Sequence, residues 1–220
     1  MYLSRVALNK RRQNTMAVLA SPHKIHATVE SSFPPGFATG VRNLWRLDRL
    51  GNNLYLLVLS GAKPDFTHVV EQYGWPNSGQ GWETKDYTRL LNRIQAGQKW
   101  QFRLRANPVH SVKQKTASEE KEDARRGKVY AHTTVQQQER WLLERAGKYG
   151  FFLKEEWFRV IQRETKRFQR QGETVTLGTV TFDGILEVTD APLFQEALIR
   201  GIGRAKAYGC GLLTVAKVPS

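Results

Sequence analysis

Two histidines three residues apart are the side chains of this sequence best suited to proton transfer. His23 and His26 lie in residues 22–33, where Ile25, Val29 and Phe33 are spaced as on one face of a helix. Residues three apart share a helix face, and Lys24 adds positive charge beside them. An imidazole has a pKa of about 6.5, so it can both accept and donate a proton near neutral pH. A lone histidine is more often structural or solvated, but a pair on a basic segment favours a catalytic site.

The charge of the chain predicts a polyanionic partner. Thirty-four Lys and Arg face twenty Asp and Glu, which gives a net charge of +14 and a pI near 10.1. A membrane does not fit, because the longest apolar run, residues 54–59, is too short to span a bilayer. The basic-then-apolar stretch at residues 10–20 is also too short for a signal peptide. We therefore expect a cytoplasmic protein that binds nucleic acid.

RNA cleavage is the reaction that these histidines could perform unaided. The 2′-hydroxyl of RNA is its own nucleophile, so the enzyme supplies proton transfer, in-line geometry and charge stabilisation. The sequence contains no GxxxxGK[ST] phosphate loop, no HExxH and no acidic cluster for two magnesium ions. Its single cysteine, Cys210, excludes a CxxC zinc site and a disulfide framework. We expect catalysis without a metal or cofactor.

Two further segments are candidates for holding phosphates. The first, residues 201–211, has glycines that could let phosphates approach backbone N–H groups; the alternative is a helix end followed by a turn. Its candidate residues are Gly201, Gly203, Arg204, Lys206, Gly209 and Gly211. The second, residues 154–170, contains six cations around a predicted basic hairpin tip at residues 163–172; the alternative is a solvated face. Its candidate contacts are Arg159, Arg163, Lys166 and Arg167.

The pattern of elements predicts an α+β fold of two tandem ferredoxin-like (RRM-like) βαββαβ domains, residues 1–97 and 98–220. In the first we expect a strand at 2–9, a basic loop, the helix at 22–33, strands at 43–50 and 53–60 joined by Gly51-Asn52, a helix at 65–73, a loop at 77–81 and extended chain at 85–94. In the second we expect a strand at 100–110, an exposed loop at 111–128, a helix at 134–149, strands at 157–162 and 174–189, a helix at 191–200 capped by Asp190, and a strand at 212–218.

Four segments resemble the CasE-type CRISPR RNA endoribonucleases. They are residues 1–6, residues 26–34 with Phe33-Pro34, the string FRLRANP at 102–108, and GIGRAKAYGCGLL at 201–213. The resemblance implies tandem ferredoxin-like domains and cleavage at the base of a CRISPR repeat RNA hairpin through a 2′,3′-cyclic phosphate. It also implies that the protein keeps the mature guide RNA within Cascade and contacts other Cascade subunits, the backbone subunit among them.

The resemblance also implies roles for individual residues. The catalytic histidine of the family stands seven residues before the Phe-Pro pair, a position that His26 occupies here. Members can carry tyrosine three residues earlier, where this chain has His23, and often proline where it has Arg204. Lys24, and Arg103 and Arg105 of the FRLRANP string, are further expected RNA contacts. The alternatives are a non-catalytic RNA-binding subunit, which only a cleavage assay separates, and a ribosomal-type structural protein.

Overall fold

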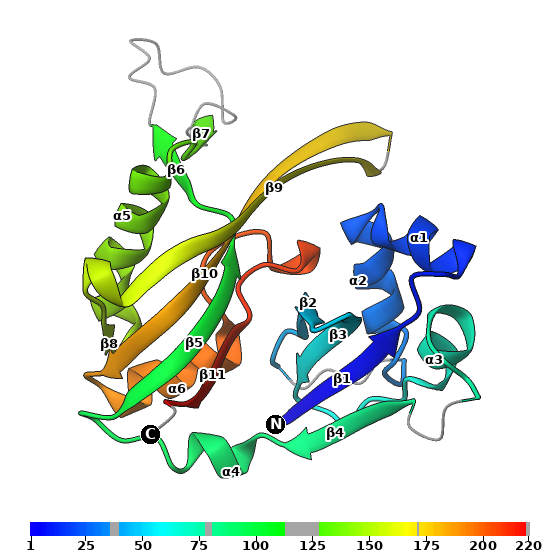
Figure 1. Ribbon diagram of the computed structural model, residues 1–220, viewed down its shortest axis with the longest axis horizontal. Coiled ribbons are helices and arrows are strands. Elements are labelled where there is room, and N and C mark those ends of the chain that lie inside the picture. Colours follow the sequence, from blue (N-terminus) through cyan, green and yellow to red (C-terminus); the bar gives the residue numbers. More distant parts are fainter. Residues whose placement is uncertain (36–39, 78–80, 113–127, 171, 219–220) are drawn as a thin grey trace.

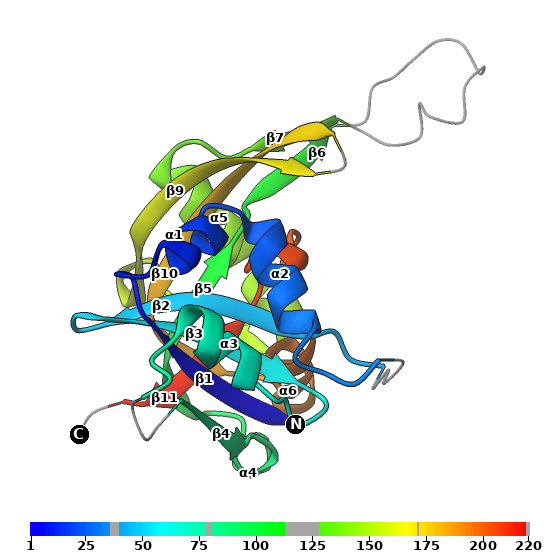
Figure 2. The ribbon, with the colours of Figure 1, turned by 90° about the vertical axis from the view of Figure 1, so that its right-hand side faces the viewer.

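The computed structural model describes residues 1–35, 40–77, 81–112, 128–170 and 172–218, and its fold mixes helices with antiparallel sheets (Figures 1 and 2). The first half of the chain contains a four-stranded sheet of order β2-β3-β1-β4. Its strands are β1 (Tyr2–Leu8), β2 (Leu44–Leu50), β3 (Asn53–Ser60) and β4 (Trp82–Asp86). Its helices are α1 (Gln13–Leu19), α2 (Pro22–Glu30), α3 (Thr67–Tyr73) and α4 (Thr88–Leu91).

The second half contains a sheet of order β11-β5-β10-β8, in which the long strand β9 also pairs with β10. Its strands are β5 (Lys99–Ala106), β8 (Phe151–Phe152), β9 (Phe158–Arg170), β10 (Glu173–Val188) and β11 (Leu213–Lys217). Its helices are α5 (Val135–Ala146) and α6 (Ala191–Arg200), and a separate ribbon pairs β6 (Val109–Val112) with β7 (Lys128–Ala131). In the first sheet β1 lies between β3 and β4, and in the second β5 lies between β10 and β11.

Local sequence explains where the helices begin. Pro22 stands in the first turn of α2, where a missing N–H costs nothing. Thr134 and Gln137 form a capping box at α5, and the Asp190 carboxylate accepts a hydrogen bond from the backbone N–H of Leu193 at the start of α6. These ends match the expected ones closely.

Helix α2 is held against the first sheet by an apolar face. Ile25 and Val29 are buried in a cluster that also contains Val6 and Trp45, from strands β1 and β2. The opposite side of α2 contacts the short helix η4 (Lys206–Tyr208) and strand β9 from the second half of the chain. The helix that carries the candidate histidines therefore lies where the two halves meet.

Several expected elements are wrong. The segment after β1 contains helix α1 rather than only a basic loop, because Thr15 donates a hydrogen bond to the carbonyl of Tyr73 at 2.9 Å and Val18 is buried. Residues 85–94 contain the end of β4 and then helix α4 rather than an extended segment. The strand expected at 100–110 ends at Ala106, and residues 109–112 form β6. The exposed loop expected at 111–128 lies mostly outside the described residues.

The bounds predicted for the basic hairpin tip, residues 163–172, are also wrong. Strand β9 continues to Arg170 and pairs with β10 as far as Arg170 opposite Glu173, with one register shift at Thr181 and Phe182. Residues 163–170 are therefore part of a strand. The cations of this segment consequently lie along a strand that curves toward α1 and α2 (Figures 1 and 2).

Candidate active site

His26 lies on the exposed side of α2 with one ring nitrogen shielded from solvent. About 27% of its side chain is exposed, and Nδ1 is buried without a hydrogen-bond partner among the described residues. The nearest acceptor to Nδ1, Oε1 of Glu30, is 3.6 Å away, too long for a hydrogen bond. His23 and Lys24 are exposed, and His23 is close enough to lower the pKa of His26. The structure thus brings the two predicted histidines together on one face.

Cations from two other elements face His26. Burial is the largest influence on its pKa and lowers it, Glu30 opposes this, and the charges of Arg42, His23 and Arg170 lower it further. Arg42 lies in the chain leading to β2, and Arg170 is the last residue of β9. Because the pKa lies below its usual value, the imidazole is mainly neutral at pH 7 and can accept a proton.

The pH dependence of cleavage should report this lowered pKa. If neutral His26 accepts the proton of the 2′-hydroxyl, the second-order rate constant should rise with pH to a midpoint below about 6.5 and then level off. Glu30→Gln should move the midpoint lower still, because the Glu30 charge raises the pKa. The measurement is single-turnover cleavage at subsaturating protein across pH 4.5–8. A midpoint at or above about 6.5 would contradict the assignment.

The glycine-rich segment follows α6 and packs tightly against the first half of the chain. Gly209 has φ +78°, and a Cβ there would lie 2.5 Å from the Trp45 ring; Gly201, at φ +74°, would meet the side chain of Leu44 at 2.7 Å. Gly201, Gly209 and Gly211 are buried, so no phosphate can reach these three positions directly. These three glycines allow the segment to turn and pack, which agrees with the alternative interpretation of a helix end followed by a turn. Gly203 is less buried.

The cations of this segment line an open cavity. Gly203, Arg204 and Lys206 meet Arg42 and Arg200 around a space of about 440 Å³. Burial lowers the pKa of Lys206, and the charges of Arg42 and Arg200 lower it further. The guanidinium of Arg204 donates to the hydroxyl of Ser111 at 3.3 Å. Arg42 links this cavity to His26, because it influences the pKa of both Lys206 and His26.

The four predicted RNA contacts on β9 differ in whether their side chains bind other parts of the protein. Arg159 and Arg167 are exposed along β9, whereas Arg163 donates to the carbonyl of Thr133. The Lys166 ammonium donates to the carbonyl of Leu19 at 3.1 Å and so ties β9 to the end of α1. Arg163 and Lys166 therefore make hydrogen bonds within the protein, in addition to any contact with RNA.

Arg103 and Arg105 lie on β5 within ion pairs. Arg103 binds Asp183 through two hydrogen bonds, and this pairing raises the pKa of its guanidinium. Arg105 is buried and binds Glu164 at 2.6 Å and Thr179 at 3.1 Å. Arginines with these partners stabilise the second sheet, so we leave both out of the proposed RNA surface.

Sequence analysis did not single out Arg42, Arg170 or Arg200 as site residues. Arg170 stood in the basic run, but Arg42 and Arg200 belong to no local pattern, and only the fold brings them to the cavity. Within the described ranges, no three His, Cys, Asp or Glu side chains are grouped as a metal site would need. None of the helices described is long and apolar enough to cross a membrane.

Comparison with known proteins identifies the family. The sequence matches the family described as "CRISPR associated protein" over residues 1–217. This chain belongs to that family. It is 31% identical to the CRISPR-associated endoribonuclease Cse3 of Thermus thermophilus, in an alignment that covers 98% of this chain and 100% of the relative. The CRISPR system Cascade subunit CasE of Escherichia coli is 31% identical over 56% of this chain and 61% of its own length.

Solved structures agree with the sequence comparisons. A structure of Cse3 bound to a 19-nucleotide RNA superposes with a TM-score of 0.75 at 28% identity, covering 98% of this chain and 100% of the other. A Thermus thermophilus Cse3 structure with an RNA representing a pre-cleavage complex gives 0.75 at 27% identity, with 98% of each chain covered. The resemblance drawn from four sequence segments is confirmed, as is the mixed helix-and-sheet class.

Proposed function

We propose that this protein is an endoribonuclease that binds the hairpin of a CRISPR repeat RNA and cuts precursor CRISPR RNA at its 3′ base without a metal ion. The observation that carries the proposal is the position of His26, a partly buried, mainly neutral imidazole that faces Arg42 and Arg170 beside the cavity lined by Lys206. The family relationship supports it, because the relative with full coverage is named an endoribonuclease and was solved with RNA. A non-catalytic RNA-binding subunit is the alternative.

The proposed reaction is a transesterification. The 2′-oxygen attacks the adjacent phosphorus, the bond from phosphorus to the 5′-oxygen breaks, and a 2′,3′-cyclic phosphate and a 5′-hydroxyl result. His26 accepts the 2′-hydroxyl proton, and Arg42, Arg170 and Lys206 stabilise the negative charge that develops on the phosphorane. The departing 5′-oxygen takes up a proton from solvent. His23 is exposed and near His26, so it is assigned an assisting role.

The fold and the assembly are part of the same proposal. Both halves have the strand order of a ferredoxin-like βαββαβ module, which supports two tandem modules divided near residues 97 and 98. The CasE relative is named a Cascade subunit, which supports contacts with other Cascade subunits. Retention of the mature guide RNA and contact with the backbone subunit complete the proposal.

Chelation tests the metal-free mechanism. Cleavage of a repeat hairpin, chosen from a panel of CRISPR repeat RNAs, should proceed at the same rate in excess EDTA as in magnesium, because His26 and the surrounding cations supply the chemistry. The measurement is the single-turnover rate in each buffer. Loss of cleavage in EDTA that magnesium restores would exclude this mechanism, and binding without any cleavage would favour the non-catalytic alternative.

The outer part of β9 should contribute phosphate contacts. Arg167→Glu with Arg170→Glu should weaken hairpin binding and reduce the slope of log K against log salt by roughly 0.7–0.9 per lost contact. Both side chains are exposed at the end of β9. The matched control is Arg89→Glu with Arg93→Glu, an exposed pair on and next to α4. Equal slopes for the two double variants would show that RNA does not follow β9.

A further inference from the structure

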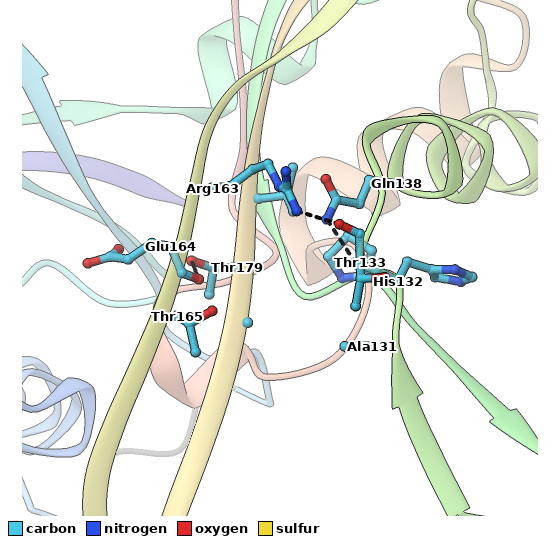
Figure 3. A pocket seen from close by; sticks show the side chains of 11 residues that line it. Ala131, His132, Thr133, Gln138, Arg163, Glu164, Thr165 and Thr179 are labelled. Carbon is cyan, nitrogen blue, oxygen red and sulfur yellow. Dashed lines mark hydrogen bonds between the residues drawn. The ribbon is translucent and has the colours of Figure 1, made fainter.

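A second cavity lies on the other side of β9 from α2. It has a volume of about 210 Å³ and sits between the β9–β10 ribbon and the junction of β7 with α5. Arg163 and Thr165 line it from β9, Gly178 from β10, and Thr133 and Gln138 from the start of α5 (Figure 3). It shares no lining residue with the cavity around Lys206. Its size is below the roughly 300–1,000 Å³ typical of drug-sized ligands, so a single ring system would fit.

One wall of this cavity contains a hydrogen-bond acceptor without a donor. Gln138 is 4% exposed, and its Nε2 donates to the carbonyl of His132 at 2.8 Å, which fixes the orientation of the amide. Its Oε1 is buried and has no partner within the described residues. Leaving such a buried oxygen unpaired costs about 1–3 kcal/mol. A donor from a ligand or from water is therefore needed here.

The facing wall offers donors. Figure 3 shows the Arg163 side chain directed toward Gln138, whereas the His132 imidazole points away from the cavity. A guanidinium has five N–H groups, and Arg163 uses one nitrogen to bind the Thr133 carbonyl. The cavity thus presents an acceptor and a donor side by side, the pattern that the edge of a nucleobase complements.

We propose that this cavity binds one unpaired nucleobase of the bound RNA, an inference that rests on the proposed function. Gln138 Oε1 accepts a hydrogen bond from an amino or imino group of the base, and Arg163 donates to an acceptor on the same edge. Strand β9 connects the two sites, because Arg163 and Arg170 are separated by about 23 Å of extended chain. An RNA bound along β9 passes the cavity on its way to His26.

Gly178 allows the cavity to be filled without breaking the fold. A Cβ at this position meets no atom within 4 Å, and the residue lies within β10. Valine is favoured in strands, so Gly178→Val should fold while its side chain projects into the cavity. Thr176→Val is the matched control, since residue 176 is exposed and two positions along the same face of β10.

The experiment is an abasic scan. A repeat hairpin that the protein cleaves is synthesised with one abasic nucleotide at each unpaired position in turn, and affinity is measured by fluorescence anisotropy in a His26→Ala background. One position should lose about 5- to 100-fold in affinity when its base is removed, the range expected for a base held by two hydrogen bonds, one of them from a charged group. Gly178→Val should weaken binding of the intact hairpin by the same factor and abolish the penalty at that position. Thr176→Val should retain the penalty.

The contrary results are distinct. If removal of no base lowers the affinity, or if the loss persists in Gly178→Val, the cavity does not bind a base and holds only water. Tight binding of the intact hairpin would in that case still support the proposed function. Failure of every protein to bind any repeat hairpin would overturn both proposals. Should Gly178→Val not fold, as judged by its thermal unfolding, Gln138→Met replaces it, with Gln136→Met on the exposed side of α5 as its control.

Discussion

Replacing His26 with alanine should slow single-turnover cleavage by about 10²–10⁴-fold, the usual contribution of general acid–base catalysis. The dissociation constant for the uncut hairpin should change by less than about tenfold, because the cations along β9 and around Lys206 remain. The fold should also survive, since Nδ1 of His26 has no hydrogen-bond partner among the described residues and Ile25 and Val29 form the buried face of α2.

Two other histidines serve as controls for this result. His110→Ala should leave the rate unchanged, because His110 lies on the β6–β7 ribbon and stacks against Tyr130. His23→Ala should cost less than His26→Ala, because its side chain is exposed. Near-normal cleavage by His26→Ala, or joint loss of binding and cleavage, would remove His26 from the proposed catalytic role.

Arg46→Met should lower the free energy of unfolding by about 3–5 kcal/mol, the cost of leaving a buried charge without its partner. Arg46 is 2% exposed and forms two hydrogen bonds of 2.7 Å with Asp48, which is 7% exposed. The same guanidinium donates to the carbonyls of Arg103 and Leu212, in β5 and beside β11, and to the Thr214 hydroxyl. It therefore joins the first sheet to the second.

Equilibrium urea unfolding checks this prediction. Arg49→Met, an exposed position on the same strand, should change stability by less than about 0.5 kcal/mol. Arg46→Met combined with Asp48→Leu should recover part of the loss, because no charge is left unpaired, although the carbonyls of Arg103 and Leu212 still lack their donor. Equal stability of Arg46→Met and Arg49→Met would show that the buried pair does not hold the halves together.

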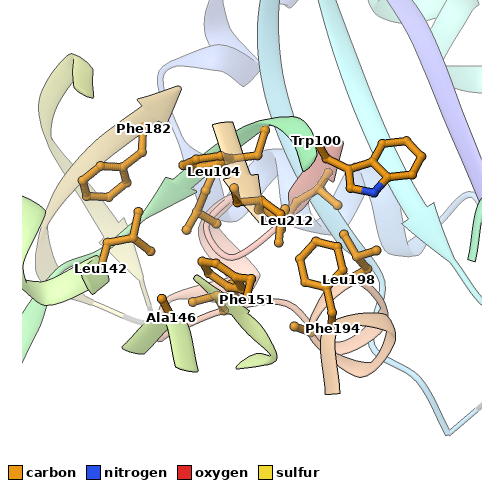
Figure 4. Close-up of a cluster of buried hydrophobic side chains, with 14 of the residues drawn as sticks. Trp100, Leu104, Leu142, Ala146, Phe151, Phe182, Phe194, Leu198 and Leu212 are labelled. Carbon is orange, nitrogen blue, oxygen red and sulfur yellow. The ribbon is translucent and has the colours of Figure 1, made fainter. Parts of the chain in front are cut away.

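The hydrophobic core crosses the same boundary. Leu44 and Leu59 of the first sheet belong to one buried cluster with Trp100, Leu104 and Phe182 of the second half, part of which Figure 4 shows. The first half keeps a second cluster of its own around Val6 and Trp45, whereas the core of the second half extends into the first sheet. The division proposed near residues 97 and 98 is therefore one of strand order.

Helices whose ends and buried faces depend on residues close in sequence could be predicted from the sequence. The spacing of Ile25 and Val29 predicted α2, and the Asp190 cap predicted the start of α6. Helix α1 was missed because it has seven residues and depends on a hydrogen bond to Tyr73, which is distant in sequence. Short helices of this kind are stabilised by packing rather than by propensity.

The candidate site was predicted only in part for the same reason. His23, His26 and Lys206 could be chosen from their types and spacing. Arg42 and Arg200 could not, because single arginines carry no pattern and their partners are far along the chain. The environment of Arg105 could not be predicted either, since the basic FRLRANP string gives no sign that Glu164 and Thr179 bind its guanidinium.

The placement of the site has a consequence during protein synthesis. His26 is synthesised long before Lys206 and the glycine-rich segment that packs on Trp45, because about 180 residues separate them in the chain. A nascent chain, or a fragment from interrupted translation, carries the histidine and much of the basic surface without the cations that complete the cavity. Such fragments could associate with RNA electrostatically but would lack the assembled site, so the proposed cleavage requires residues 201–211 to have been made and folded against Trp45.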